Sequence, residues 1–175
     1  MKGLLAAGHD RPQGHRREFC GVPASTLILA ALVAPTLWAG PLKPACELLT
    51  SAEAAKVLGA AVTIKQDESG PDDRGGDNCV WTTADRRNVM VRVVAVAKQD
   101  MVPLKFKQEV EEAFSGARPP EVLAALGDEA KYRTYDGNLD GGVIVGRKEK
   151  VVFTVEGRTS RKNLIDLTGA LLSRL

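Results

Sequence analysis

Histidine is almost absent from this chain of 175 residues, which contains only His9 and His15. Both lie before residue 40, so residues 40–175 contain none. Without histidine, a serine nucleophile would need a lysine base, and the chain has no Ser-x-x-Lys sequence. A glycine-rich phosphate loop is also missing. These absences argue against the common nucleophilic hydrolases and against P-loop enzymes.

An excess of charge of either sign is missing from residues 40–175 as well. The whole chain has 24 Lys and Arg and 22 Asp and Glu, of which residues 1–39 hold four and two, so residues 40–175 carry 20 of each sign. A neutral domain has no long-range field that would attract phosphate backbones or anionic lipid. The composition therefore argues against nucleic-acid binding.

The first 39 residues have the three parts of a secretory signal peptide. Positive residues up to Arg17 precede an apolar run over residues 22–38, and the small residue Ala39 follows. A membrane-spanning helix needs about 20 uninterrupted apolar residues, whereas two prolines interrupt this shorter run. We therefore expect a signal peptide at 1–39, cleaved rather than retained as an anchor. The rest, 40–175, is expected to be a single domain, periplasmic or secreted, without stable membrane insertion.

The leader leaves the export route open. Arg16-Arg17-Glu18-Phe19 resembles a twin-arginine signal, but ordinary positive charge on a general secretion signal explains the same residues. A lipoprotein signal would need small residues directly before its cysteine. Cys46 follows Lys43-Pro44-Ala45 and Cys20 follows Arg17-Glu18-Phe19. Lipidation is therefore not expected.

Cysteine is scarce, and after cleavage only Cys46 and Cys79 remain. An exported protein meets an oxidising compartment, which favours a disulfide between them. The rival interpretation is a reactive or metal-binding pair. Two thiolates without histidine make a poor zinc site, and their spacing is not that of a redox Cys-x-x-Cys motif. We expect the disulfide, which closes a loop around the Gly- and Asp-rich segment 67–78.

Hydrophobic periodicity and capping motifs predict an α+β fold. Thr50-Ser51-Ala52-Glu53 is a capping box that would begin a helix ending at Gly59. Alternating apolar residues and polar turns predict strands at 62–64, 79–83, 89–97, 129–135, 143–145 and 151–155. Further helices are expected at 103–114, 120–126 and 161–174. Together these elements indicate an antiparallel sheet with helices packed on one face.

The two halves of residues 40–175 share an order of elements, namely short helix, Leu-Gly, strand, hairpin and longer helix. Val57-Leu58-Gly59 in the first half corresponds to Ala125-Leu126-Gly127 in the second. A distant internal duplication, giving two pseudo-repeats, explains this order. Two unrelated halves that use the same simple motif explain it as well. The expected fold class is the same in both cases.

Several short motifs resemble a bacterial family of exported domains of unknown function, whose best-populated members are small actinobacterial lipoproteins. They are Cys46-Glu47-Leu48-Leu49-Thr50, Glu53, Leu58-Gly59, Cys79-Val80-Trp81-Thr82 and Leu126-Gly127-Asp128-Glu129-Ala130. The resemblance covers nearly all of residues 45–175. It implies a disulfide between the two motif cysteines and an α+β domain on the outer side of the membrane, but no activity. The chain departs from the family's lipoprotein pattern in lacking a lipid-acceptor cysteine.

One sequence motif resembles a calcium-binding loop. In residues 136–141, oxygen-bearing side chains alternate at Asp136, Asn138 and Asp140, and glycine occupies the sixth position. The twelfth position, where a bidentate glutamate should complete the shell, is instead the cation Arg147. A polar hairpin turn explains the same residues. We therefore predict a turn, and no metal or other cofactor.

Trp81 and the acidic loop 67–78 also have structural explanations. Trp81 follows Cys79 by two residues, so we expect it to pack on the disulfide rather than form an aromatic platform for a sugar or peptide. The loop could bind a cation or a basic partner. Its Gly, Pro and charge content is typical of a mobile solvated loop, which is the interpretation we favour.

Cations cluster where the last helix is expected to begin. Arg158, Arg161 and Lys162 lie beside two hydroxyl residues, and a helix amino terminus of this kind could hold an anion. A simpler explanation is that Ser160 caps the helix. The sequence favours the cap.

These observations favour an exported envelope domain with a non-enzymatic role. It would bind a partner protein, a peptide or a small ligand, or act as an accessory scaffold. The alternative is a small envelope hydrolase that uses paired carboxylates. That hypothesis requires two acidic side chains that face each other in a concave pocket and have raised pKa values.

The disulfide hypothesis gives a direct test. In the chain-entropy model, a loop of this size contributes about 3–4 kcal/mol to the free energy of unfolding. We expect reducing agent to lower the melting temperature by roughly 10 °C, and Cys79→Ala to do the same without reductant. Differential scanning calorimetry measures both. An unchanged melting temperature in both experiments would show that the disulfide does not stabilise the domain.

Overall fold

The computed structural model describes residues 42–115, 119–136 and 140–175. The expected signal peptide at 1–39 and Asn138 of the calcium-like motif lie outside these residues. Within the described ranges, no helix is long and apolar enough to cross a bilayer.

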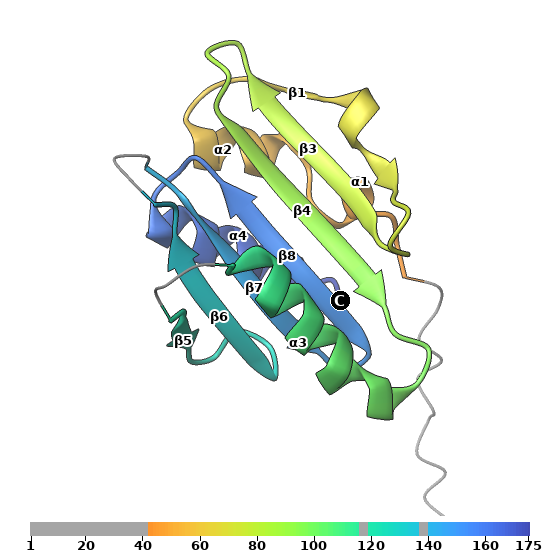
Figure 1. Ribbon diagram of the computed structural model, residues 1–175. Helices are drawn as coiled ribbons and strands as arrows, with labels where there is room; N and C mark the ends of the chain where they lie inside the picture. Colours follow the sequence, from red (N-terminus) through yellow and green to blue (C-terminus); the bar gives the residue numbers. More distant parts are fainter. Residues whose placement is uncertain (1–41, 116–118, 137–139) are drawn as a thin grey trace, which may run out of the picture. The chain divides into compact units, whose positions relative to one another are not determined.

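An eight-stranded antiparallel sheet forms the centre of the domain (Figure 1). Seven strands follow the order β1-β3-β4-β8-β7-β6-β5, and β2 pairs with β3. The strands are β1 (Val62–Ile64), β2 (Gly70–Pro71), β3 (Asp77–Thr83), β4 (Asn88–Ala95), β5 (Glu121–Leu123), β6 (Glu129–Thr134), β7 (Gly142–Lys148) and β8 (Val151–Gly157). Pairing of β4 with β8 joins the first half of the domain to the second.

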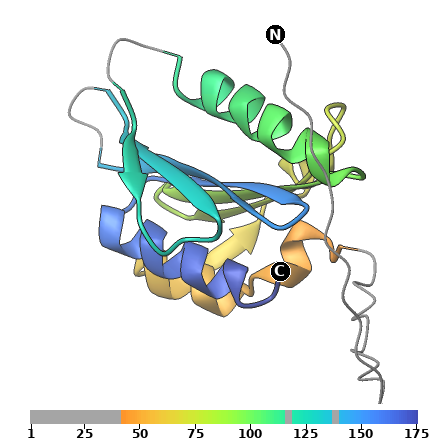
Figure 2. The same cartoon turned by 90° about the horizontal axis from the view of Figure 1, so that it is seen from below.

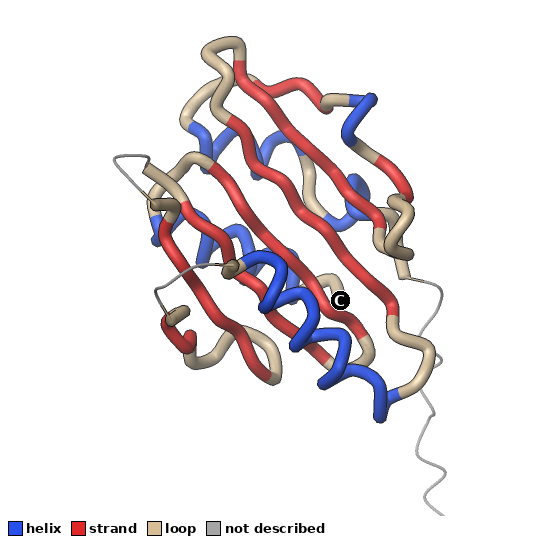
Figure 3. The backbone as a smooth tube through the Cα atoms, in the orientation of Figure 1, coloured by secondary structure: helices blue, strands red, loops and turns tan. Residues whose placement is uncertain are grey.

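In the described part of the chain, four α-helices accompany the sheet, which confirms the expected α+β class (Figure 3). They are α1 (Ala45–Leu48), α2 (Ser51–Leu58), α3 (Val102–Ala113) and α4 (Arg161–Leu172), with 3₁₀ turns η1 at Gln66–Glu68 and η2 at Gln99–Met101. The predicted capping box is present, because the Thr50 side chain accepts from the Glu53 amide and Glu53 accepts from the Thr50 amide. Gly59 ends α2 in the left-handed region that glycine tolerates best.

The helices cover both faces of the sheet, so the expectation of helices on one face was wrong (Figure 2). α3 crosses β7 and β8 on one face, whereas α4 crosses the same two strands on the other. The physical reason lies in the alternation of side chains along β7. Ile144 packs into the core that α4 covers, while Val143 and Val145 pack against α3. A strand with apolar residues on both sides needs cover on both faces.

The short helix expected at 120–126 is instead strand β5, which pairs antiparallel with β6. Pairing with β6 gives the short segment backbone partners that a single helical turn would lack. The chain then reverses through Ala125 and Gly127, both at positive φ. A strand therefore precedes Leu126-Gly127 in the second half, whereas the helix α2 leads into Leu58-Gly59 in the first. The internal duplication remains a prediction.

The expected disulfide is present and links α1 to β3. The Cα atoms of Cys46 and Cys79 are 5.0 Å apart, and 33 positions separate the two residues in the chain. Trp81 is fully buried in the same core as Cys79, so the expected core position is confirmed and its ring is not exposed as a platform. A bonded cysteine pair is compatible with an extracellular location.

A buried arginine ties the acidic loop and α3 to the sheet. Arg92 on β4 is 2% exposed, and its Nε donates to Asp72 Oδ2 at 2.5 Å. Its Nη1 lies 2.7 Å from Glu109 Oε2 on α3, as an ionic contact that lacks hydrogen-bond geometry. Asp72 also accepts from the amides of Arg74 and Gly76. The expectation of a mobile solvated loop is therefore wrong at Asp72, because an ion pair with the sheet fixes it.

The electrostatics of this cluster explain why its carboxylates stay ionised. The hydrogen bond from Arg92 holds the pKa of Asp72 well below its usual range. Burial would raise the pKa of Glu109, but contacts with Lys105 and Arg92 outweigh burial, so the pKa is lowered. Arg92 neutralises Asp72, and it shares the neutralisation of Glu109 with Lys105.

Removing Arg92 should therefore be costly. We expect Arg92→Met to lower the free energy of unfolding by about 3–5 kcal/mol, because Asp72 loses its cation and Glu109 loses one of two. Urea denaturation at pH 7 measures the change. Lys107→Met is the matched control, since the Lys107 side chain is 71% exposed, and it should change stability by less than about 0.5 kcal/mol. Equal stabilities of the two variants would contradict a structural role for Arg92.

A second arginine fixes the end of the chain against the first helices. Arg174, just beyond α4, donates two hydrogen bonds to the Glu53 carboxylate at 2.8 and 2.9 Å, and a third to Leu48 O at 2.7 Å. Glu53 is also the capping-box residue of α2. The hydrogen bond from Arg174 is the main cause that lowers the pKa of Glu53 to about 2.

The ion pair between Glu53 and Arg174 makes the free energy of unfolding depend on pH. The folded-state pKa of Glu53 lies below its ordinary value of 4.5, so its stabilisation is present above that value and is lost as pH falls toward 2. We expect Glu53→Gln to cost about 1 kcal/mol at pH 7, a modest value because solvent screens the pair. Calorimetry from pH 7 to pH 2 should show the difference from wild type shrinking below pH 4.5.

The control for this measurement is Glu111→Gln, because the Glu111 side chain is 66% exposed on α3. Its melting temperature should follow that of wild type at every pH. A Glu53→Gln deficit that stays constant down to pH 2 would contradict the ionic role of Glu53.

Candidate functional site

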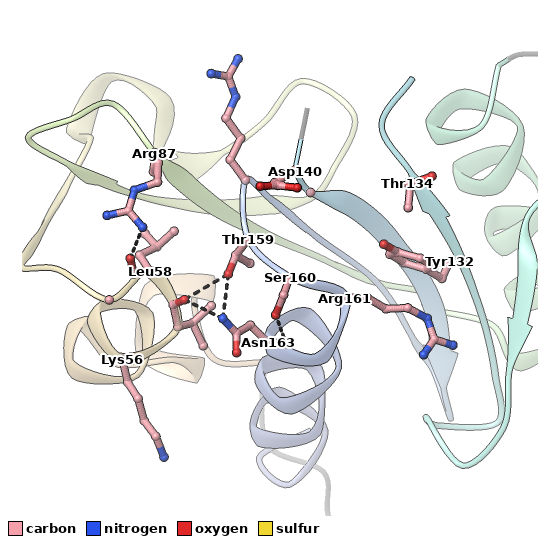
Figure 4. Close-up of a pocket in the computed structure, with 14 residues that line it drawn as sticks. Lys56, Leu58, Arg87, Tyr132, Thr134, Asp140, Thr159, Ser160, Arg161 and Asn163 are labelled. Atoms are coloured by element: carbon pink, nitrogen blue, oxygen red, sulfur yellow. Dashed lines mark hydrogen bonds between the residues drawn. The ribbon is translucent and has the colours of Figure 1, made fainter. Parts of the chain in front are cut away.

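A hollow of about 840 Å³, here named the α2–α4 pocket, lies where the end of α2 meets the start of α4 (Figure 4). Six segments line it, namely the end of α2, the β3–β4 turn, the end of β6, the chain just before β7, the chain between β8 and α4, and the start of α4. Its charged lining residues are Lys56, Arg87, Asp140, Arg158 and Arg161.

The floor of the pocket is formed by contacts between the two helix ends. Val57 O at the end of α2 accepts from Thr159 Oγ1 at 3.0 Å and from Asn163 Nδ2 at 2.9 Å. Arg87 donates to Leu58 O. The carboxyl end of α2, with its partial negative charge, therefore faces the amino end of α4, with its partial positive charge.

Ser160 caps α4, as the sequence predicted. Its Oγ accepts from the Asn163 amide at 3.2 Å, and its backbone has the extended conformation of an N-cap residue. The cap explains the hydroxyl at this position.

Two of the cations that line the pocket have identified partners. Arg161 forms an ion pair with Glu121 on β5, and its guanidinium lies 5.5 Å from the centroid of the Tyr132 ring (Figure 4). Arg87 pairs with Asp85 in the β3–β4 turn at 2.8 Å. Both arginines are therefore held in place at the wall of the pocket.

The remaining charges leave the pocket positive. Arg158 and Lys56 have no ion-pair partner among residues 42–115, 119–136 and 140–175. The Lys56 side chain points away from the labelled cluster, so it lies at the rim (Figure 4). Asp140 is the acidic residue among the lining residues. Cationic groups thus outnumber carboxylates here, although residues 40–175 as a whole are balanced.

The structure describes only part of the calcium-like motif. Asp136 and Asp140 are exposed, and Asp140 lines the α2–α4 pocket, while Asn138 lies outside the described residues. In the part of the chain that is described, no three His, Cys, Asp or Glu residues gather where they could hold a metal ion. Asp140 is therefore better understood as part of the pocket.

The hydrolase hypothesis required two facing carboxyl groups with raised pKa values. Glu109 and Glu156 line one groove on the α3 face of the sheet. Burial raises the pKa of Glu156, whereas the pKa of Glu109 is lowered, and Glu109 is engaged by Arg92 and Lys105. This pair does not have the properties that the hypothesis requires.

Sequence reasoning identified some of the pocket residues and missed others. Arg158, Arg161 and Ser160 were recognised from their cluster. Thr159 and Asn163 were not recognised as partners of Val57, because 102 and 106 positions separate them from it. No local pattern carries a contact between segments so far apart.

Comparison with known proteins finds no matching family model, no matching curated protein and no matching solved structure. The resemblance to a family of exported domains stays a prediction. Inference of function therefore depends on the geometry and charge of the sites themselves.

Proposed function

We propose that this chain is an exported, non-enzymatic binding domain of the periplasm or the extracellular space, whose ligand carries an anionic group. The observation that carries the proposal is the positive α2–α4 pocket within a domain of balanced charge. Carboxylate and phosphate share the chemistry that such a pocket recognises, because both accept hydrogen bonds from guanidinium groups.

The size of the pocket supports a ligand of small-molecule dimensions. A volume of about 840 Å³ falls in the range of typical ligand pockets, roughly 300–1,000 Å³. Its polar groups come from β6, from the segment after β8 and from two helices, so they converge from elements that the sheet holds in place. A rigid frame of this kind lowers the entropy lost on binding.

Arg158 is the residue expected to contribute most to binding. Arg87 and Arg161 already have carboxylate partners, so an incoming anion would compete with Asp85 or Glu121 for them. Arg158 has no such competitor among the described residues, and an anion beside it would gain a charge-assisted interaction.

Two features support a location outside the cytoplasm. The leader and the Cys46–Cys79 disulfide both fit an oxidising environment. The proposed ligand would therefore be met outside the cytoplasm, as a free metabolite or as part of a peptide or partner protein.

The test is a calorimetric titration of the purified protein with inorganic phosphate and with hexanoate at low ionic strength. We expect millimolar or tighter binding of at least one of these anions, because the pocket offers an uncompensated cation. Arg158→Gln should weaken that binding about tenfold, and added salt should weaken it further. Lys107→Gln removes one exposed cation from α3 and serves as the control.

Two results would overturn the proposal. One is that neither anion binds to the wild-type protein. The other is that Arg158→Gln and Lys107→Gln bind the anion equally well, since binding would then reflect overall charge rather than the pocket.

A further inference from the structure

A second hollow lies on the face of the sheet that α3 covers, and residues of β4, β8 and α3 line it. This α3 groove has a volume of about 310 Å³. Apolar and aromatic side chains in it include Met90, Val143 and Tyr135. Its charged groups are Arg74, Arg92, Glu109, Glu112, Arg133 and Glu156.

Most charges in the α3 groove are engaged with one another or with α3. Arg74 pairs with Glu112, and Arg92 pairs with Asp72 and Glu109. Arg133 donates to Ala113 O at 3.4 Å and lies 5.5 Å from the centroid of the Phe114 ring. These contacts connect α3 to the sheet and to the loop around Asp72.

Glu156 is different, because it has no ion-pair or hydrogen-bond partner among the described residues. Its neighbours across the strands are Met90 on β4 and Val143 on β7. Neither has a positively charged side chain. Burial raises the pKa of Glu156, which agrees with a carboxylate that lacks compensation. A partly buried carboxylate without a partner is a ready site for a cationic group.

The α3 groove adjoins the α2–α4 pocket at one end of the sheet. Thr134, the last residue of β6, lines both hollows. Glu156 and Arg158 are two positions apart at the end of β8, and one lines each hollow. Two residues of extended chain span about 6–7 Å, so the Cα atoms of this uncompensated acid and this uncompensated base lie about that far apart.

From this juxtaposition we infer that Glu156 forms a subsite for an ammonium group, on a ligand whose carboxylate lies beside Arg158. The ligand class is a zwitterion, such as an amino acid or a short peptide with both groups free. The inference rests on the proposed function, because it assigns the anionic end of the ligand to the α2–α4 pocket.

The recognition follows from charge complementarity at two points. An anion alone would contact only the Arg158 side, and the Glu156 carboxylate would stay uncompensated. A zwitterion neutralises both groups at once, and its two contacts bind as one linked pair. The separation of its charges should therefore matter, with tightest binding when the ligand spans the distance from Glu156 to Arg158.

The experiment compares matched ligands that differ only in the ammonium group. Hexanoate and 6-aminohexanoate are titrated into the purified wild-type protein by calorimetry at pH 7 and low ionic strength. Glycine, 4-aminobutyrate and 8-aminooctanoate extend the series of charge separations. We expect one amino acid of the series to bind about tenfold more tightly than hexanoate, the gain of one charge-assisted contact.

Three variants assign that gain to a residue. Glu156→Gln keeps the shape of the side chain and removes its charge, so the amino acid should bind no better than hexanoate, while phosphate binding stays unchanged. Arg158→Gln should weaken hexanoate and the amino acid alike. Glu111→Gln, on the exposed side of α3, should leave all affinities unchanged.

The outcomes separate this inference from the proposed function. Equal affinity for hexanoate and every amino acid in the wild-type protein would overturn the ammonium subsite and leave the anion site standing. An advantage of the amino acid that persists in Glu156→Gln would overturn it too. Absence of binding by phosphate, hexanoate and the whole series would overturn the proposed function itself.

Discussion

The antiparallel pairing of β4 with β8 sets the positions of nearly everything else in this domain. Seven residue pairs form the ladder, from Val89 opposite Gly157 to Ala95 opposite Val151. In this register Val91 and Val155 point into the core beneath α1, α2 and α4, while Arg92 and Glu156 point to the α3 face. A slip of one residue would exchange the two sets, so burial of the valines specifies the register strongly. The same register therefore specifies where the polar groups lie.

The two faces of the sheet have different chemistry as a consequence. The face toward α4 is a continuous apolar core that includes Trp81, Ile144 and Phe153. The face toward α3 combines a smaller apolar cluster with the buried ion pairs of Arg92. Buried ion pairs recover little free energy relative to apolar packing, but breaking one is costly. On this face, Arg92 therefore joins α3 and the loop around Asp72 to the sheet.

The sequence allowed the class of the fold to be predicted well, because the strongest signals are local. The capping box at Thr50 and Glu53, the alternation in β4 and the leucines of α4 each lie within a few residues of chain. Placement of the helices on two faces was missed, although the consecutive valine and isoleucine residues of β7 carried that signal. The helix expected at 120–126 failed because pairing with β6 outweighed a weak local pattern.

The candidate sites were less predictable, since each depends on contacts between distant segments. Arg158 and Arg161 attracted notice as a cluster, but their pocket exists only because α2 ends against Asn163. Nothing near Arg92 in the chain indicates that it is buried, because its partners Asp72 and Glu109 lie 20 and 17 positions away and on opposite sides of it in sequence. Composition could show that residues 40–175 are balanced in charge. It could not show that folding separates the charges into different environments.

That separation is the feature most relevant to binding. Most acids and bases on the α3 face neutralise each other, as do Glu53 and Arg174 on the opposite side. Glu156 and Arg158 lie close together in the chain yet line different hollows. β8 ends at Gly157, between them, and a Cβ atom at that position would lie 2.5 Å from Val89 Cγ2. The tight approach of β4 thus fixes the backbone between the two charged residues. A backbone fixed at this point lowers the conformational cost of presenting the two side chains to the ligand that we propose.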